Sequence, residues 1–265
     1  MKIAPAPYRP DPRIFDLGTG APFFDPVAPA EFPRAVLRFR NDRTAASVGL
    51  AHLDDAAWIR HFARFHPLAD NLPTPLALRY HGHQFRTYNP DLGDGRGFLF
   101  AQMRDDHGRL LDLGAKGSGK TPYSRAADGR LTLKGGVREI LATEMLEALG
   151  VYTSKTFSVI ETGESLQRHD EPSPTRSCVL VRLSHSHVRF GTFQRLAHEG
   201  DAAAIDRLVD YCIRHFEPDL AQVPNRAAAW FARVVERTAL FAAQWICFSC
   251  VALFLVCRSI HYPHL

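Results

Sequence analysis

The chain has 265 residues, a formal net charge of +4, 46% hydrophobic residues and 23% charged residues. These values exclude a disordered, collagen-like or disulfide-scaffold protein, because each of those classes has a strongly biased composition. The net charge is too small to indicate nucleic acid or a membrane surface as a partner. A soluble enzyme of one large or two small domains fits the length.

The cysteines and the N-terminus bear on localisation. All five cysteines lie at or after Cys178, in an odd number and without a regular spacing. This pattern argues for a reducing compartment. The first residues contain one lysine but no apolar segment of the kind found in secretory signals. We therefore expect a cytoplasmic protein.

The N-terminal two thirds of the chain are predicted to be rich in strands. Residues 1–34 are expected to form an extended arm, because four prolines in 22–33 disfavour a helix. Residues 45–66 have a helical pattern that ends near Pro67. Short runs of β-branched or bulky apolar residues then predict four strands. These strands are Phe98–Met103, Leu110–Ala115, Phe157–Glu161 and Cys178–Leu183.

Helices dominate the remainder. One helix is predicted over about 137–149 and ends at Gly150, between the second and third predicted strands. The turn-rich residues 169–176 separate the last two strands as a hairpin loop would. Asp201 is a candidate N-cap for a further amphipathic helix, and a last helix begins near Ala227. This order predicts an α+β fold in which the strands of a mixed sheet, with one embedded helix, come before the remaining helices in the chain.

A glycine-rich turn, PDLGDGRG at 90–97, precedes the first of the four strands. Gly93 and Gly95 would let backbone N–H groups approach a phosphate, and Arg96 would add a fixed positive charge. A plain hairpin turn is the alternative interpretation, because a Gly-Asp-Gly sequence by itself is common in turns.

Residues Gly114 to Thr121 spell the P-loop pattern G-x-x-x-x-G-K-T. A P-loop must open directly into a helix, whereas Pro122 follows at once and no amphipathic helix is predicted before about residue 136. The context therefore argues against a P-loop, and a P-loop NTPase is kept only as an alternative function.

A lysine on a strand and a glutamate on the next helix suggest another nucleotide site. Lys116 ends a predicted strand and Glu139 lies in the following helix, as in protein kinases, where such a pair fixes the lysine that holds ATP phosphates. Residues 96–138 hold nine Lys and Arg against four acids, a surplus that suits a polyphosphate. Arg182 and Arg189 could reach one anion from two sides. A solvated basic face is the alternative, but the aromatic residues of an RNA-binding surface are sparse.

Two H-x-H pairs, His81 with His83 and His185 with His187, permit a metal-site hypothesis. No further ligand spacing accompanies them. Histidines also serve often as hydrogen-bonded structural groups, and we favour that interpretation here.

Several of these motifs occur together in one family. They are YHGHQF at 80–85, LGDGR at 92–96, KGSGKTPYSR at 116–125, DGR at 128–130, RE at 138–139 and SHVRFG at 186–191. Over roughly residues 35–245 the chain resembles the selenoprotein O family of protein adenylyltransferases. The resemblance implies a protein-kinase-like (pseudokinase) fold that binds ATP in a flipped orientation. It also implies transfer of AMP to Ser, Thr or Tyr hydroxyls of protein substrates, with no nucleic acid as partner.

The resemblance also implies residue roles. Glu139 would orient Lys116, and the two arginines would bind the terminal phosphates in a pocket that an ordinary kinase lacks. The residues implied for ATP binding are Gly93, Gly95, Arg96, Lys116, Asp128, Gly129, Arg182 and Arg189.

After Trp245 the sequence departs from the family pattern. The family continues into Asn-Thr-Asp-Asn and Asp-Tyr-Gly sequences, which supply its catalytic base and its metal ligands, and neither occurs before Leu265. The sequence therefore predicts no catalytic residue and no metal ligand in this chain, although Mg²⁺ is expected for the family. We expect a truncated or frameshifted product with impaired transfer, and an ATP-binding or interaction module without catalysis is the alternative.

The expected organisation follows from this departure. Residues 35–200 would form a kinase-like N-lobe, residues 201–245 the start of a helical C-lobe and residues 246–265 an aberrant apolar tail. Residues 238–257 contain no Lys, Arg, Asp or Glu and are long enough to span a bilayer. We favour over membrane insertion a helix that begins the C-lobe core and would be buried by elements absent from this chain.

Overall fold

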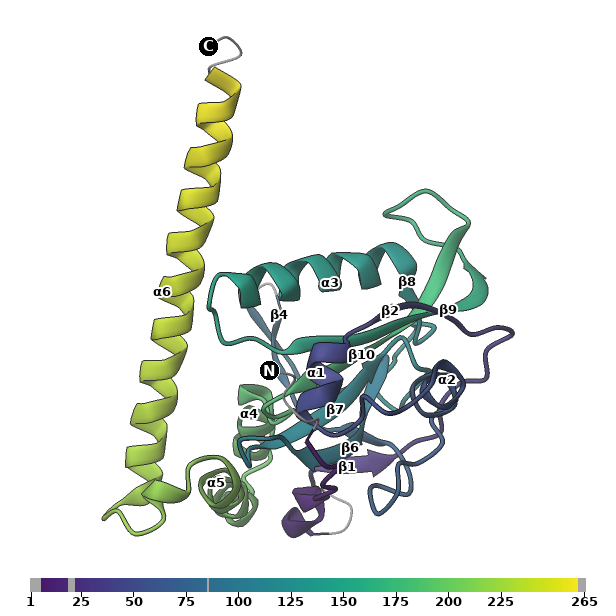
Figure 1. The fold of residues 1–265 in the computed structure, drawn as a ribbon. Coiled ribbons are helices and arrows are strands. Elements are labelled where there is room, and N and C mark those ends of the chain that lie inside the picture. Colours follow the sequence, from purple (N-terminus) through teal and green to yellow (C-terminus); the bar gives the residue numbers. More distant parts are fainter. Residues whose placement is uncertain (1–5, 19–21, 85, 262–265) are drawn as a thin grey trace.

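One large antiparallel sheet organises the chain (Figure 1). The structure is a computed structural model and describes residues 6–18, 22–84 and 86–261. Seven strands follow the order β1-β3-β6-β7-β10-β9-β2, and β8 pairs with β10 as the eighth. Their bounds are β1 Phe24–Pro26, β2 Val36–Arg40, β3 Leu76–Leu78, β6 Gly97–Arg104, β7 Leu110–Lys116, β8 Leu131–Thr132, β9 Lys155–Leu166 and β10 Thr175–Ser184. A separate hairpin pairs β4 (Gly82–Gln84) with β5 (Thr87–Asn89).

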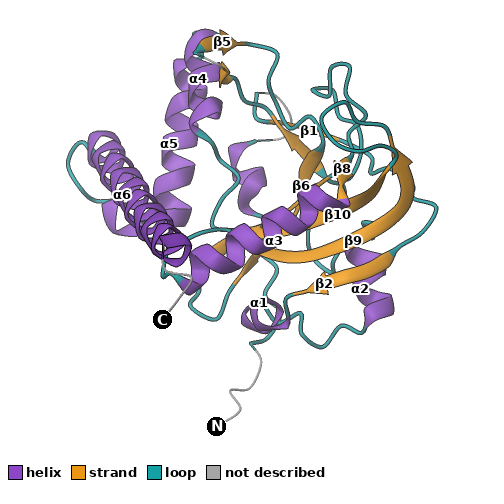
Figure 2. Cartoon of the chain, turned by 90° about the horizontal axis from the view of Figure 1, so that it is seen from above, coloured by secondary structure: helices purple, strands orange, loops and turns teal. Residues whose placement is uncertain are grey.

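Helices flank this sheet, and α3 lies across it against β9 and β10 (Figure 2). Side chains cap several of the helices: Asn41, Asp54, Thr132 and Asp201 each accept a hydrogen bond from a backbone N–H of the first turn. The α-helices are α1 Asp42–Ser47, α2 Asp55–Phe62, α3 Leu133–Ala148, α4 Phe190–His198, α5 Ala202–Phe216 and α6 Arg226–His261. Two short 3₁₀ helices are η1 Arg13–Leu17 and η2 Pro218–Leu220.

The expected mixed sheet is wrong for the described strands, since all of their pairings are antiparallel. The reason lies in the crossover from β7 through α3 to β9. Such a crossover would place two parallel strands side by side. Here β10 lies between β7 and β9 and pairs antiparallel with both. Strands β7 and β9 therefore run parallel to each other but are not hydrogen-bonded to each other.

The four predicted strands are confirmed as β6, β7, β9 and β10, and all four are longer than predicted, the last two by the most. The predicted loop between β9 and β10 is present, although Thr175 already belongs to β10. The helix predicted over about 137–149 begins earlier, at Leu133, because Thr132 caps it. The single helix over 45–66 is wrong. Gly49 has a φ of +75°, which ends α1, and Asp54 caps a separate helix α2.

The described residues of the segment 1–34 pack against the rest of the fold. It forms η1 and the edge strand β1, which pairs with β3. Phe23 immediately precedes that strand, Phe24 is its first residue, and both side chains are buried. Burial of such side chains removes apolar surface from water, so this segment is anchored to the sheet.

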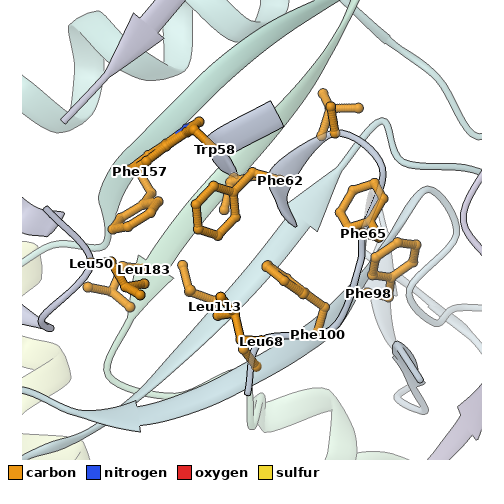
Figure 3. Close-up of a cluster of buried hydrophobic side chains, with 14 of the residues drawn as sticks. Leu50, Trp58, Phe62, Phe65, Leu68, Phe98, Phe100, Leu113, Phe157 and Leu183 are labelled. Atoms are coloured by element: carbon orange, nitrogen blue, oxygen red, sulfur yellow. The ribbon is translucent and has the colours of Figure 1, made fainter. Parts of the chain in front are cut away.

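An aromatic cluster forms the main core (Figure 3). Trp58 and Phe62 project from α2 onto the sheet. The Trp58 ring is stacked on Phe157 of β9 at a centroid distance of 4.8 Å, and Phe62 meets Phe157 edge-on at 5.2 Å. All three side chains are fully buried. These contacts fix α2 on the sheet face opposite the one covered by α3.

A second core connects the sheet to the C-terminal helices. Leu208 and Cys212 of α5 pack with Ile14 of η1 and Leu99 of β6. The long helix α6 rises beside the end of α3 (Figures 1 and 2), where Tyr152 stacks on Phe241 at 6.2 Å between ring centroids. In the described part of the chain, no helix combines the length and apolar character needed to cross a bilayer.

Candidate nucleotide site

A cavity of about 490 Å³ lies above β7 and β10, beside the turn that leads into β6. Segment 123–127 and the residues just before α4 complete its wall. Six of the eight residues implied for ATP binding line it: Gly93, Gly95, Arg96, Lys116, Arg182 and Arg189. The fold therefore brings together the glycine turn, the strand lysine and both arginines.

The glycine turn requires its glycines because another segment packs directly on it. A Cβ atom on Gly93 would lie 2.3 Å from Cγ of Tyr123, and one on Gly95 would lie 2.8 Å from the carbonyl oxygen of Tyr123. The Tyr123 hydroxyl in turn donates a hydrogen bond to Asp25. The aromatic ring, which itself lines the cavity, thus holds the turn in place.

Two hydroxyl groups in the same segment fix the carbonyls of the turn. Thr121 Oγ1 donates to the carbonyl of Asp94 at 2.5 Å, and Ser124 Oγ donates to the carbonyl of Gly95 at 2.5 Å. With these carbonyls engaged, the turn is fixed beside the cavity before any ligand is present.

The predicted pairing of Lys116 with Glu139 is present. Lys116 Nζ donates to Glu139 Oε1 at 2.5 Å, and the guanidinium of Arg182 lies 3.4 Å from Glu139 Oε2. Burial opposes ionisation of Glu139, but the hydrogen bond from Lys116 and the nearby positive charges bring its pKa below the ordinary value. The ionised carboxylate therefore anchors two cations that line the cavity.

Both arginines have additional partners. Arg182 donates to Ser154 Oγ at 2.5 Å. The guanidinium of Arg189 lies 3.3 Å from Asp94 and 4.8 Å from the centre of the Tyr80 ring. Asp94 is almost completely buried, and that burial raises its pKa although Arg189 opposes the shift. These contacts hold the guanidinium groups in defined positions against the cavity.

Two further arginines at the cavity carry charge that no described acid neutralises. Arg96 and Arg125 are both exposed, both line the cavity, and neither has an ion pair within the described residues. Arg125 also has a φ of +53°, which is uncommon for a residue with a side chain. Both guanidinium groups are available to an anionic ligand.

Asp128 and Gly129 are not among the residues that line this cavity. The Asp128 carboxylate binds Arg168 at 2.8 Å and accepts the backbone N–H of Arg130. The carbonyl of Gly129, whose φ is +73°, accepts a hydrogen bond from Gly119 at 3.2 Å. In this structure the two residues stabilise the loop between β7 and β8.

The P-loop context is absent, as the sequence predicted. Strand β7 ends at Lys116, and turns and irregular structure follow until β8 begins at Leu131. Lys120 is exposed and does not line the cavity. The G-K-T sequence therefore has no helix N-terminus on which a phosphate could bind.

The H-x-H histidines form no metal-binding group within the described residues. His81 Nδ1 lies 2.8 Å from the hydroxyl of Tyr88, and His187 is held by Asp112. Across the described ranges, no group of three or more His, Cys, Asp and Glu side chains could hold a metal ion. Asp94, which lines the cavity, and Glu139, which holds the lining residue Lys116, are already paired with cations, so these residues do not fit a Mg²⁺ site.

Several cavity residues had no assigned role in the sequence-based prediction. They are Tyr80, Asp94, Tyr123, Ser124, Arg125 and His187. All six lie inside the motifs that carried the family resemblance, which is the signal that could have identified them. Their contributions depend on contacts between distant segments, which spacing along the chain does not reveal.

Comparison with known proteins identifies the family of the chain. The sequence model of the family described as protein adenylyltransferase SelO matches residues 10–252. Among curated relatives, a protein nucleotidyltransferase YdiU of Gloeobacter violaceus is 55% identical over 238 residues, covering 89% of this chain and 48% of that protein. The YdiU protein of Synechococcus elongatus is 53% identical over 232 residues, covering 86% of this chain and 46% of that protein.

More distant relatives carry the same name. The protein nucleotidyltransferase YdiU of Vibrio cholerae is 39% identical over 223 residues, covering 84% of this chain and 45% of that protein. The chain thus spans about half the length of the curated relatives that it matches. Because the family model matches most of its length and the curated relatives are about 39–55% identical, the chain belongs to the SelO family of protein adenylyltransferases.

Proposed function

We propose that this chain binds ATP in the cavity above β7 and β10, as the nucleotide-binding part of a protein adenylyltransferase. The observation that carries the proposal is the contact between Lys116 and Glu139, 2.5 Å long, at a cavity that Arg182 and Arg189 also line. Three cations fixed by acidic or hydroxyl partners suit the phosphates of ATP, because little ordering is needed on binding.

A protein-kinase-like fold is part of the same proposal. The order of a glycine turn, a strand, a lysine and then a helix with a glutamate is that of a kinase nucleotide site. In this chain the order runs from Gly93 through β6 and β7 to Lys116 and Glu139, on an antiparallel sheet with one helix across it. The order and the salt bridge support the proposal together.

The orientation of the nucleotide follows from where the cations lie. Arg182 is supplied by β10 and shares the partner Glu139 with Lys116, and Arg189 is supplied by the segment before α4 and contacts Asp94 of the glycine turn. We place the terminal phosphates with the two arginines. The α-phosphate would then be exposed to an attacking hydroxyl of a protein substrate.

AMP transfer joins a hydroxyl oxygen to the α-phosphorus and breaks the bond from that phosphorus to the bridging oxygen, releasing pyrophosphate. The hydroxyl proton must go to a base. Asp94 is paired with Arg189 and Glu139 with Lys116, so neither of these carboxylates at the cavity is free to accept it. We therefore expect this chain to bind ATP and to transfer AMP slowly.

The test uses ATP labelled on either the α- or the γ-phosphate, incubated with the chain and a protein that offers Ser, Thr and Tyr hydroxyls. Slow incorporation of the α label, without the γ label, is the expected result. Incorporation of the γ label would contradict adenylyl transfer, because it would show kinase chemistry. Rapid α-label incorporation would contradict the expectation of slow transfer.

A nucleotide-binding module without catalysis is the second candidate. The observation that favours it is that Asp94, which lines the cavity, and Glu139, which holds Lys116, are both paired with cations. ATP binding without incorporation of either label, even after long incubation, would decide for this alternative.

A further inference from the structure

The floor of the cavity carries an imidazole that has no role in the function proposed so far. His187 lines the cavity together with Lys116, Arg182 and Arg189. A Cβ atom on Gly114 would lie only 2.1 Å from His187 Nε2. The ring therefore occupies the space over β7 that the missing side chain of Gly114 leaves open.

The register of the sheet places this imidazole among the cations. Arg182 on β10 is paired with Gly114 on β7, and directly paired residues of antiparallel strands have their side chains on the same face. Lys116 lies two positions further along β7 and so shares that face. Nε2 of His187 thus lies at the part of the floor that Arg182 and Lys116 border.

The other edge of the ring is held by buried groups. Asp112, which is 2% exposed, accepts the backbone N–H of His187 at 2.7 Å, and its Oδ2 lies 3.4 Å from Nδ1. Ser184 Oγ lies 3.2 Å from the same Nδ1, and Gln102 donates to the other oxygen of Asp112 at 2.7 Å. No described residue hydrogen-bonds to Nε2, so this edge remains for a ligand.

We propose that His187 is a third contact for the terminal phosphates of ATP, beside Arg182 and Arg189, with Nε2–H as the donor. The inference rests on the proposed ATP-binding function. The neutral ring carries its hydrogen on Nε2 when the Ser184 hydroxyl donates to Nδ1. An imidazolium donates from Nδ1 to Asp112 and from Nε2 to phosphate. In these two forms Nε2–H is the donor at the cavity, whereas a neutral ring with its hydrogen on Nδ1 would donate to Asp112 and leave Nε2 as an acceptor.

Two substitutions separate a phosphate contact from a structural role. In His187→Asn the amide nitrogen mimics Nδ1, so the contact to Asp112 is retained while the Nε2 donor is lost. In His187→Gln the amide nitrogen mimics Nε2, so a donor still reaches the cavity. The same Asn substitution at the exposed His83 is the matched control, because His83 lies outside this cavity.

The measurement is calorimetric titration of the full chain and its variants with ATP and with AMP. We expect His187→Asn to weaken ATP binding about tenfold and to leave AMP binding unchanged, as loss of one charge-assisted hydrogen bond would do. His187→Gln should retain most of the preference for ATP, and His83→Asn should match the unchanged chain. Circular dichroism would establish that each variant is folded.

Other outcomes overturn the proposal. Equal weakening of ATP and AMP by His187→Asn would show that the residue shapes the cavity rather than contacting phosphate. Unchanged ATP binding would show that Nε2 makes no contact. If the unchanged chain binds neither nucleotide, the proposed function itself fails, and that result is distinct from a failure of His187 alone.

Discussion

Individual side chains at the cavity are held by partners that fix their positions in the absence of a ligand. Glu139 holds Lys116 and Arg182, while Asp94 and Tyr80 hold Arg189. Each cation therefore loses little conformational freedom when a phosphate binds. We therefore expect small changes in the supporting residues to alter nucleotide binding even where these residues touch no ligand.

Gly93→Ala tests this support directly. The new methyl group would lie 2.3 Å from Cγ of Tyr123, so the ring or the turn must move. We expect ATP binding to weaken by roughly tenfold, with a loss of about 1–3 kcal/mol in the free energy of unfolding. Gly82→Ala is the control, since its Cβ would meet other atoms only at ordinary contact distances of 3.6 Å and more. Unchanged ATP affinity in Gly93→Ala would show that the turn does not form part of the site.

Whole elements are held together by the aromatic core and by ion pairs that cross strands. Trp58 and Phe62 bind α2 to the sheet through Phe157. On the sheet edge, Glu161 of β9 accepts hydrogen bonds from Arg38 of β2 and Arg176 of β10. The aromatic contacts of α2 are independent of pH, whereas the hydrogen bonds to Glu161 depend on ionisation of its carboxyl group.

Phe157→Ala should lower the free energy of unfolding by about 3–5 kcal/mol, because it removes a fully buried ring that contacts two aromatic neighbours. Urea denaturation measures the change. Phe231→Ala on α6 removes the same group from a side chain that is 65% exposed, and we expect a change within about 0.5 kcal/mol. Equal effects of the two substitutions would contradict the described core.

Glu161 provides a pH-dependent test. The hydrogen bond from Arg176 is the main cause that lowers the pKa of Glu161 from 4.5 to about 2. A carboxyl whose pKa is lowered by folding stabilises the protein above the unfolded value, and this contribution is lost as the pH falls toward the folded value. The stability difference between the chain and Glu161→Gln should therefore be constant above about pH 5 and shrink between pH 4.5 and 2. Denaturation at several pH values measures it, and a difference that does not shrink would contradict the ion pair.

At the scale of the whole molecule, the sequence predicted the parts of the fold that have strong local patterns. Strands β6, β7, β9 and β10 are runs of bulky apolar residues, and α3 and α5 have helical periodicity and caps. The break at Gly49 was missed although the glycine and the Asp54 cap are local signals for it, and the short strands β1 and β3 were missed because tertiary pairing determines them. Strand pairing also cannot be inferred from periodicity, which is why a mixed sheet was expected.

The candidate site was predictable to a similar extent. Lys116, Glu139 and the two arginines carry charge in a recognisable order, and the structure brings them to one cavity. Asp128 and Gly129 lie in a loop that stabilises itself. The position of His187 depends on Gly114, a contact between residues far apart in the sequence that no local motif encodes.

The most direct test of the ATP site is a titration of the chain with ATP, compared with Lys116→Ala and Lys120→Ala. Lys116 lines the cavity, whereas Lys120 is exposed outside it and only completes a P-loop-like sequence. We predict that the chain binds ATP, that Lys116→Ala weakens binding by roughly ten- to a hundredfold and that Lys120→Ala leaves it unchanged. Loss of binding in Lys120→Ala with retention in Lys116→Ala would contradict the proposed site, as would no binding of ATP by the unchanged chain.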